Sequence, residues 1–255
     1  MGKRPFHILS VEGQPKVGKT HLALTAPGPI AIQSLDFGTE GVVDKFESEK
    51  DIMVKEYDLA YDFTITTRGD ESSAQAAEVR DKYWKPFVDD AEEFFKNFRT
   101  VVWDTASEVW EMLKLAYFGK LEKNPQLAYG PVNAEYKALC RLANTYRTNF
   151  VLCHQQGKVY KNVTDDKGRL QSIETDQWKR QGNNKIGNLV HSYVEQTFQQ
   201  PEKDHRGNVT KPGTFYTEIL GARYAPDQVG IKLERVDWDT LMSILAPHVE
   251  DWDAD

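Results

Sequence analysis

The sequence has few cysteines, no long apolar run and no excess of positive charge, and each absence excludes a class of protein. Its two cysteines, Cys140 and Cys153, provide neither a disulfide framework nor a metal cluster, which indicates a reducing compartment. No segment is apolar enough to span a membrane and residues 1–5 lack the apolar core of a signal peptide, so we expect a cytoplasmic protein without membrane contact. The net charge of −7 argues against wholesale wrapping of nucleic acid and leaves only a local basic patch for that purpose.

The rest of the composition is typical of a globular protein, with 40% hydrophobic and 28% charged residues over 255 positions. Short apolar runs predict strands near residues 6–11, 30–35, 52–54, 100–105 and 149–153. Apolar residues at helical spacing predict helices at residues 21–24, 74–98 with a division at Pro86, 106–121, 132–147 and 238–245. Strands that alternate with helices predict an α/β fold whose central sheet is mostly parallel and flanked by helices.

Beyond residue 155 the pattern changes. A hairpin is expected within residues 158–185, and strands at 190–199 and 214–224 are expected to form a small antiparallel β extension around a turn at 204–208. Residues 57–73 are expected to form a surface loop. We therefore expect a single domain over residues 1–255, made of a core (1–155), a β-rich extension (156–236), a C-terminal helix (237–249) and an acidic tail (250–255).

The most informative segment is a glycine-rich loop after the first apolar run. Residues 13–20 read G-x-x-x-x-G-K-T, the phosphate-loop (P-loop, or Walker A) pattern, between a predicted strand and a predicted helix as this motif requires. Lys19 is expected to reach the β- and γ-phosphates of ATP, and the Thr20 hydroxyl is expected to bind Mg²⁺. The expected nucleotide-binding residues are Gly13, Gln14, Pro15, Lys16, Val17, Gly18, Lys19, Thr20 and His21.

Carboxylates follow two of the other predicted strands. Asp104 ends the fourth strand, where it is expected to hold Mg²⁺, although an aspartate in this position often serves as a helix N-cap instead. Asp36 and Glu40 follow the second strand, and either is a candidate to orient or deprotonate the water that attacks the nucleotide. The alternative is that one of them caps a helix near Gly38. The sequence does not choose between Asp36 and Glu40.

Two polar segments follow the fifth predicted strand. His154 and Gln155 end it and are expected to contact the γ-phosphate, unless they face solvent. Residues 158–185 then carry more Lys and Arg than Asp and Glu, interleaved with Tyr160 and Trp178, as in single-strand nucleic-acid binding sites. A solvated surface hairpin has the same composition. The expected DNA-binding residues are Lys158, Tyr160, Lys161, Lys179, Arg180 and Lys185.

Taken in chain order, these motifs resemble the RecA-type ATPase core. The residues that carry the likeness are the loop at 13–20, Leu35-Asp36 with Glu40 beyond, Val101-Val102-Trp103-Asp104-Thr105 and His154-Gln155. The Pro-Lys inside the loop and the Ala-Pro-Gly-Pro after its helix look like bacteriophage nucleotide-binding proteins of that group, some of which act in single-strand annealing or recombination. The likeness covers residues 6–155 well and 156–225 loosely. One departure is Gly38, which stands where the RecA-type glutamate usually lies.

The resemblance implies an ATPase of phage recombination or replication that works in the host-cell cytoplasm with ATP and Mg²⁺. It would bind single-stranded DNA as a homo-oligomeric ring or filament, with Gln155 as the catalytic-site sensor of the nucleotide and the segment after it as a DNA-contacting loop.

Two further features concern partners. A charge from a neighbouring subunit often completes such sites, and Arg223 and Arg206 are the candidates. The acidic tail, with Trp252, either adds solubility or docks a protein partner. Two other functions remain open: a P-loop kinase of a small metabolite, and a nucleotide-gated interaction protein with little turnover.

Overall fold

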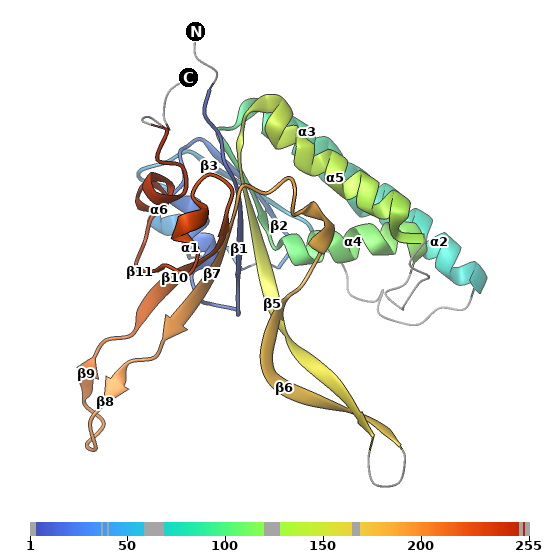
Figure 1. Cartoon of the computed structure of the whole chain (residues 1–255). Coiled ribbons are helices and arrows are strands. Elements are labelled where there is room, and N and C mark those ends of the chain that lie inside the picture. Colours follow the sequence, from blue (N-terminus) through green and yellow to red (C-terminus); the bar gives the residue numbers. More distant parts are fainter. Residues whose placement is uncertain are drawn as a thin grey trace.

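The computed structural model describes residues 4–36, 38–39, 41–58, 69–119, 128–164, 169–249 and 252, with the backbone alone at 69–72 (Figure 1). Over this part the chain forms a mixed sheet with helices on both faces, so the predicted α/β fold is confirmed. Its strands are β1 (Ile8–Gly13), β2 (Ile30–Ser34), β3 (Ile52–Glu56), β4 (Thr100–Asp104), β5 (Asn149–Thr164), β6 (Leu170–Arg180), β7 (Ser192–Gln199), β8 (Glu202–Lys203), β9 (Val209–Lys211), β10 (Thr214–Ala222) and β11 (Lys232–Glu234). Its helices are α1 (Lys19–Leu24), α2 (Gly69–Val79), α3 (Lys85–Asn97), α4 (Ala106–Phe118), α5 (Tyr129–Tyr146) and α6 (Trp238–Leu245).

The order of the strands decides which loops meet. It runs β11-β10-β7-β1-β5-β4-β2-β3, with β6 paired to β5. Strands β7, β1, β5, β4, β2 and β3 are parallel to one another, whereas β10 is antiparallel to β7, β11 to β10 and β6 to β5. Because the carboxyl ends of parallel strands share one edge, the ends of β1, β4 and β5 lie side by side there. That edge is where open α/β sheets bind their ligands.

Two apolar cores sandwich this sheet. Helices α3, α4 and α5 pack on one face, where the fully buried Trp103 contacts the rings of Phe87, Tyr136 and Phe150. Helices α1 and α6 pack on the other face, around Trp238. Figure 1 shows α1 and α6 together on one side and α2 to α5 on the other. Successive residues of a strand face opposite cores, which fixes the direction of each side chain at the carboxyl edge.

Two features differ from the sequence expectation: the place of β7 in the sheet and the start of α2. Residues 192–199 form β7, which pairs in parallel with β1 and so belongs to the main sheet, whereas we expected them in the antiparallel extension. The reason is that the preceding hairpin and loop are long enough to cross back to β1. Helix α2 begins at Gly69, inside the expected loop at 57–73, and the part of that loop at 59–68 lies outside the described residues. The helix break near Pro86 is confirmed, as a π-helical turn at Arg80–Trp84 joins α2 to α3.

Two β-ribbons project from the carboxyl edge. We call the first the β5–β6 arm, residues 157–164 with 169–179, which continues β5 beyond the sheet as an antiparallel hairpin (Figure 1). The second carries the short β8–β9 hairpin between β7 and β10. The hairpin expected at 158–185 is therefore confirmed, and it begins where β5 leaves the edge at which the phosphate loop lies.

Candidate nucleotide site

The phosphate loop connects β1 to α1, and its backbone conformation and close packing require glycine at two positions. Gly18 has φ +93°, a left-handed value that side chains with a Cβ adopt rarely, and a Cβ there would lie 3.3 Å from the ring of Phe215. A Cβ on Gly13 would lie 2.4 Å from the carbonyl oxygen of Gln196, so only glycine allows β1 to approach β7 at this point. The loop is thus held between its own helix and the neighbouring strands.

Lys19 is folded back over this loop. Its Nζ donates hydrogen bonds to the carbonyl oxygens of Gly13, at 3.1 Å, and Gln14, at 2.8 Å. The side chain is buried, and burial lowers the pKa of its ammonium group. A cation held over main-chain carbonyls at the start of a helix is placed to transfer its hydrogen bonds to an entering phosphate.

Asp104 lies at the end of β4 and faces α1. Its Oδ2 accepts a hydrogen bond of 2.6 Å from the Thr20 hydroxyl. Burial, followed by the nearby charge of Asp36, raises the pKa of the Asp104 carboxyl to about 6, although Thr20 and Lys19 act in the opposite direction. Asp104 is not the N-cap of α4, because Thr105 holds that position and accepts from the Glu108 N–H. The structure therefore leaves the Asp104 carboxylate available for a cation.

Of the two candidates for activating water, Asp36 and Glu40, the structure describes only Asp36. Asp36 is exposed at the end of β2 and lines the same cavity as Lys19 and Asp104. Its Oδ1 accepts from the Gly38 N–H at 3.0 Å, which fixes the turn that carries it. Glu40 lies outside the described residues. No side chain caps the short helix at Val43–Lys45, so Asp36 does not serve as its cap.

A cavity of about 720 Å³ joins these groups. Its phosphate end is lined by the loop and by Asp36, Asp104 and Gln155, and its other end lies between α1 and the start of α6. Sequence reasoning missed the walls of that other end, because single aromatic or charged residues in strands and connections carry no motif. Of the lining residues there, His21 was expected, and those that were missed are Thr25, Lys45, Gln196, Phe215, Thr217, Arg235, Val236 and Asp237.

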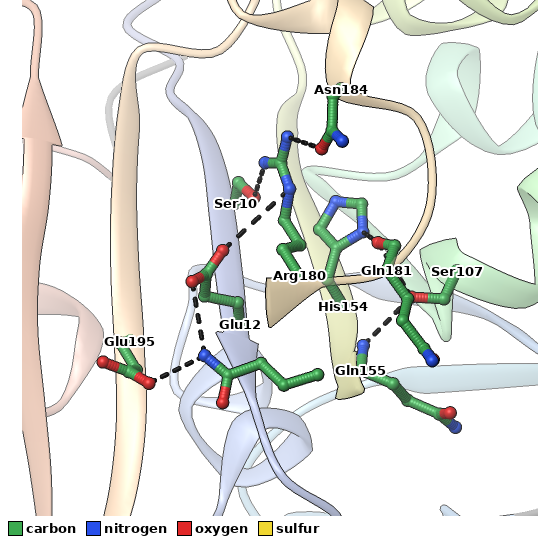
Figure 2. A network of polar contacts seen from close by, with 10 residues as sticks. Ser10, Glu12, Ser107, His154, Gln155, Arg180, Gln181, Asn184 and Glu195 are labelled. Atoms are coloured by element: carbon green, nitrogen blue, oxygen red, sulfur yellow. Dashed lines mark hydrogen bonds and ion pairs between the residues drawn. The ribbon is translucent and has the colours of Figure 1, made fainter. Parts of the chain in front are cut away.

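His154 and Gln155 lie on opposite faces of the sheet, as Figure 2 shows. Gln155 lines the cavity, whereas His154 is buried behind it with its Nδ1 3.2 Å from the carbonyl oxygen of Gln181. Burial, assisted by the charge of Arg180, lowers the pKa of His154 to about 3, so the ring is neutral. The expectation that both residues contact the γ-phosphate is therefore wrong for His154, because neighbours in a strand point in opposite directions.

Most of the expected DNA-binding residues lie on or beside the β5–β6 arm. Lys161 and Lys179 are exposed on it, and Lys185 is exposed in the turn that follows. Tyr160 is 58% exposed. Lys158 is less available, since its Nζ lies 3.5 Å from Glu174 and 4.6 Å from the centre of the Trp178 ring.

The expectation for Arg180 is corrected by its placement, whereas the expectation for Arg223 is not tested. Arg180 does not lie on the arm surface: its guanidinium turns inward to Ser10, Glu12 and Asn184, and its side chain is 12% exposed. Arg223 is exposed and donates to the main-chain carbonyls of Asn188 and Val190 of its own chain, and its role at a neighbouring subunit stays a prediction.

Trp252 is half-buried: its ring packs against His7 and Trp238, and its carbonyl oxygen accepts from Arg99. The docking of a partner through the tail stays a prediction. Residues 250–251 and 253–255 of the acidic tail lie outside the described residues. Arg206 lies exposed in the turn between β8 and β9.

Comparison with protein families decides the class of this site. The AAA domain family matches residues 8–217, from the first residue of β1 into β10, and thus includes the loop, Asp104 and Gln155. The chain belongs to the AAA domain family. The AAA domain is a P-loop ATPase domain, which agrees with the cavity that the loop and Asp104 share. No curated protein matches the sequence significantly. Within the described part of this AAA domain, no helix is long and apolar enough to cross a membrane.

Proposed function

We propose that this AAA domain is a RecA-like ATPase that hydrolyses ATP with Mg²⁺ and binds single-stranded DNA through its β5–β6 arm. The observation that carries the proposal is the convergence of Lys19, Asp104 and Gln155 on one cavity at the foot of that arm. Gln155 lines the cavity and belongs to the same strand as the arm, so the nucleotide and the arm share one element. The proposal also includes a role in phage recombination and assembly into a homo-oligomeric ring or filament. These two parts are supported by the sequence resemblance alone.

The residues at the end of β4 fit a magnesium ion. Asp104 is a buried carboxylate near a second carboxylate, Asp36, and burial followed by the charge of Asp36 raises its pKa to about 6. Carboxylate and hydroxyl oxygens are the ligands that Mg²⁺ prefers. Thr20 and Asp104 would hold the ion, which would neutralise charge that develops on the phosphates. Lys19 would exchange its two carbonyl partners for phosphate oxygens.

The far end of the cavity suits a nucleoside. Phe215 lies beside Gly18 of the phosphate loop and packs against Phe198, and it is 40% exposed, so part of its aromatic surface faces the cavity next to the phosphates. Arg235 and Asp237 supply polar groups beyond it. An aromatic surface with a few polar groups is the usual arrangement for holding a base.

The arm has the features expected of a single-strand binding ribbon. Tyr160 and Trp178 expose aromatic surface, and Lys161 and Lys179 are exposed cations on the same hairpin. Stacking on aromatics and ionic contact with phosphates together bind single strands with little sequence preference. An isolated two-stranded ribbon is marginally stable, so a ligand along it would also rigidify it. The two arginines considered for a neighbouring site, Arg206 and Arg223, are both exposed.

The proposal is tested by measuring ATP hydrolysis with and without single-stranded DNA at low and moderate salt. The test variant is K161Q/K179Q, and the matched control is K203Q/K211Q, which removes the same charge from the β8–β9 hairpin. We expect stimulation of the wild type that fades with salt, is reduced in K161Q/K179Q and persists in the control, because phosphate contacts are lost only from the β5–β6 arm.

Hydrolysis that DNA does not stimulate would contradict the DNA part of the proposal. Acceleration by a small metabolite, with transfer of phosphate to it, would identify a kinase instead. Nucleotide binding without turnover under every condition would identify a nucleotide-gated interaction protein.

A further inference from the structure

A polar network lies on the face of the sheet opposite α1, directly behind the phosphate loop (Figure 2). Glu12 of β1 is the last residue before Gly13, and its strand neighbour in β7 is Glu195. The Gln156 amide joins the two carboxylates, since its Nε2 donates to Glu12 at 3.3 Å and to Glu195 at 2.7 Å. Burial raises the pKa of Glu12, and Glu195 adds to this effect. A cation beside two partly buried carboxylates stabilises their charged forms.

Arg180, the last residue of β6 and the residue directly after the β5–β6 arm, supplies a cation here. Its Nε lies 3.9 Å from Oε2 of Glu12, and its terminal nitrogens donate to Ser10 at 3.2 Å and Asn184 at 3.0 Å. The guanidinium also lies over the ring of Tyr193, 5.3 Å from its centre. The side chain therefore joins β1, β7 and the turn after β6, and it has little capacity left for a ligand.

The residue after Arg180 is tied to the nucleotide cavity. The N–H of Gln181 donates to the carbonyl oxygen of Gln155 at 2.8 Å. The Ser107 hydroxyl connects the same two residues, as it donates to the Gln181 carbonyl oxygen and accepts from the Gln155 N–H. The end of β6 therefore has two connections to the nucleotide site. Arg180 connects it to β1, the strand that leads into the phosphate loop, and Gln181 connects it to the cavity residue Gln155.

We infer that Arg180 is a positioning residue that links the β5–β6 arm to the phosphate loop through Glu12, rather than a residue that contacts DNA. This inference rests on the proposed function, which places DNA on the arm. A ligand that reorients the arm would pull on Arg180, and through Glu12 on Gly13, whose carbonyl oxygen holds Lys19. Two ligands that favour the same arrangement of such a link raise each other's affinity, and the effect is reciprocal.

The test compares R180Q with K179Q, which removes the neighbouring, exposed charge on the same strand. Two quantities are measured separately: the affinity for a fluorescent oligonucleotide, and the stimulation of ATP hydrolysis at saturating DNA. We expect K179Q to weaken DNA binding by about two- to fivefold, with a smaller salt dependence, and to keep full stimulation at saturation. We expect R180Q to bind DNA within about twofold of the wild type and to lose at least about fivefold of the stimulation.

Two further variants keep the result interpretable. R180K retains the charge and should restore part of the stimulation, and E12Q should reproduce the R180Q defect. In the double variant E12Q/R180Q the defect should be no larger than in R180Q, because both substitutions break one contact. Thermal unfolding of each variant shows whether it is folded. If R180Q fails to fold, R180K and E12Q decide the question.

The inference is overturned if R180Q loses DNA affinity and salt dependence as K179Q does, since Arg180 would then contact phosphate. It is also overturned if R180Q keeps full stimulation. If the wild type binds no DNA, the DNA-binding part of the proposed function is wrong, but the link between the arm and the phosphate loop can still be tested by hydrogen exchange. A nonhydrolysable ATP analogue should then change exchange in the arm of the wild type and K179Q but not of R180Q, and an equal change in all three would refute the link.

Discussion

Single carboxylates set the chemistry at the carboxyl edge. Asp104 is 2% exposed and shares its surroundings with Thr20, Lys19 and Asp36, so its charged form is costly until a cation enters. Asp36 is exposed at the same cavity and is held by the Gly38 N–H. The difference in burial gives the two aspartates different tasks: Asp104 is suited to hold a cation, and Asp36 is free to approach a water molecule.

The water-activating residue can be identified by comparing Asp36→Asn with Glu40→Gln. We expect one of the two to lose roughly 100-fold or more in kcat while it still binds nucleotide, because it removes the group that orients or accepts a proton from water. The other should lose less than about tenfold. Asp44→Asn, which changes an exposed carboxylate on the next turn, is the control. Steady-state hydrolysis and calorimetric nucleotide binding give the two quantities, and full activity in both variants would exclude the pair.

Among the elements, β4 depends most on one side chain. Trp103 is fully buried, and its Nε1 donates to Oε1 of Gln33 on β2 at 2.8 Å. The Gln33 amide in turn donates to the Tyr57 hydroxyl and to the carbonyl oxygen of Phe87 in α3. Trp103 therefore fixes β4, and with it Asp104, relative to β2 and α3.

We expect Trp103→Phe to lower the free energy of unfolding by roughly 2–4 kcal/mol, because it leaves a cavity and deprives Gln33 of a buried hydrogen bond. The matched control is Trp110→Phe on α4, at a partly exposed tryptophan, which should cost less than about 1 kcal/mol. Urea denaturation measures both values. Equal losses in the two variants would show that the buried hydrogen bond contributes little.

At the scale of the whole molecule, buried histidines make the fold sensitive to acid. Burial is the main reason that the pKa of His154 falls to about 3 and that of His191 to about 4, and the pKa of His7 is also well below its ordinary value. Below pH 6.5 these histidines are protonated in the unfolded chain but stay neutral in the folded chain. Their contribution to stability is therefore present above pH 6.5 and is lost as the pH falls. Asp104, with its raised pKa, acts in the opposite direction between about pH 6 and 4.

We therefore expect stability to fall between pH 6.5 and 4, by at most about 4 kcal/mol per pH unit if all three histidines titrate in the unfolded state. Asp104→Asn should steepen the loss below pH 6, since it removes the opposing carboxyl. The same variant should be more stable than the wild type at pH 8, by about 1–3 kcal/mol, because a buried charge is gone. Urea titrations from pH 4 to 8 test both. A pH profile unchanged by the substitution would contradict the assignment of the raised pKa.

How far the sequence predicts the site depends on the distance between its parts. The phosphate loop and its helix lie within a few consecutive residues, so Lys19 and Thr20 could be placed without a structure. Asp104 could be inferred because an apolar strand that ends in an aspartate is a recognisable pattern. Phe215 and Arg235 could not, since they reach the cavity from β10 and from the segment before α6, through the order of strands that only the folded chain displays.

The α/β class, the phosphate loop and the position of the β5–β6 hairpin could be predicted from the amino-acid sequence, because each depends on local periodicity or on a motif of consecutive residues. The folded chain was needed to show that His154 and Gln155 face opposite sides of the sheet, that Arg180 points inward and that Trp252 packs on its own chain. The physical reason is that a side chain's role depends on which distant strand or helix neutralises its charge or covers its apolar surface, and these partners meet only in the folded chain.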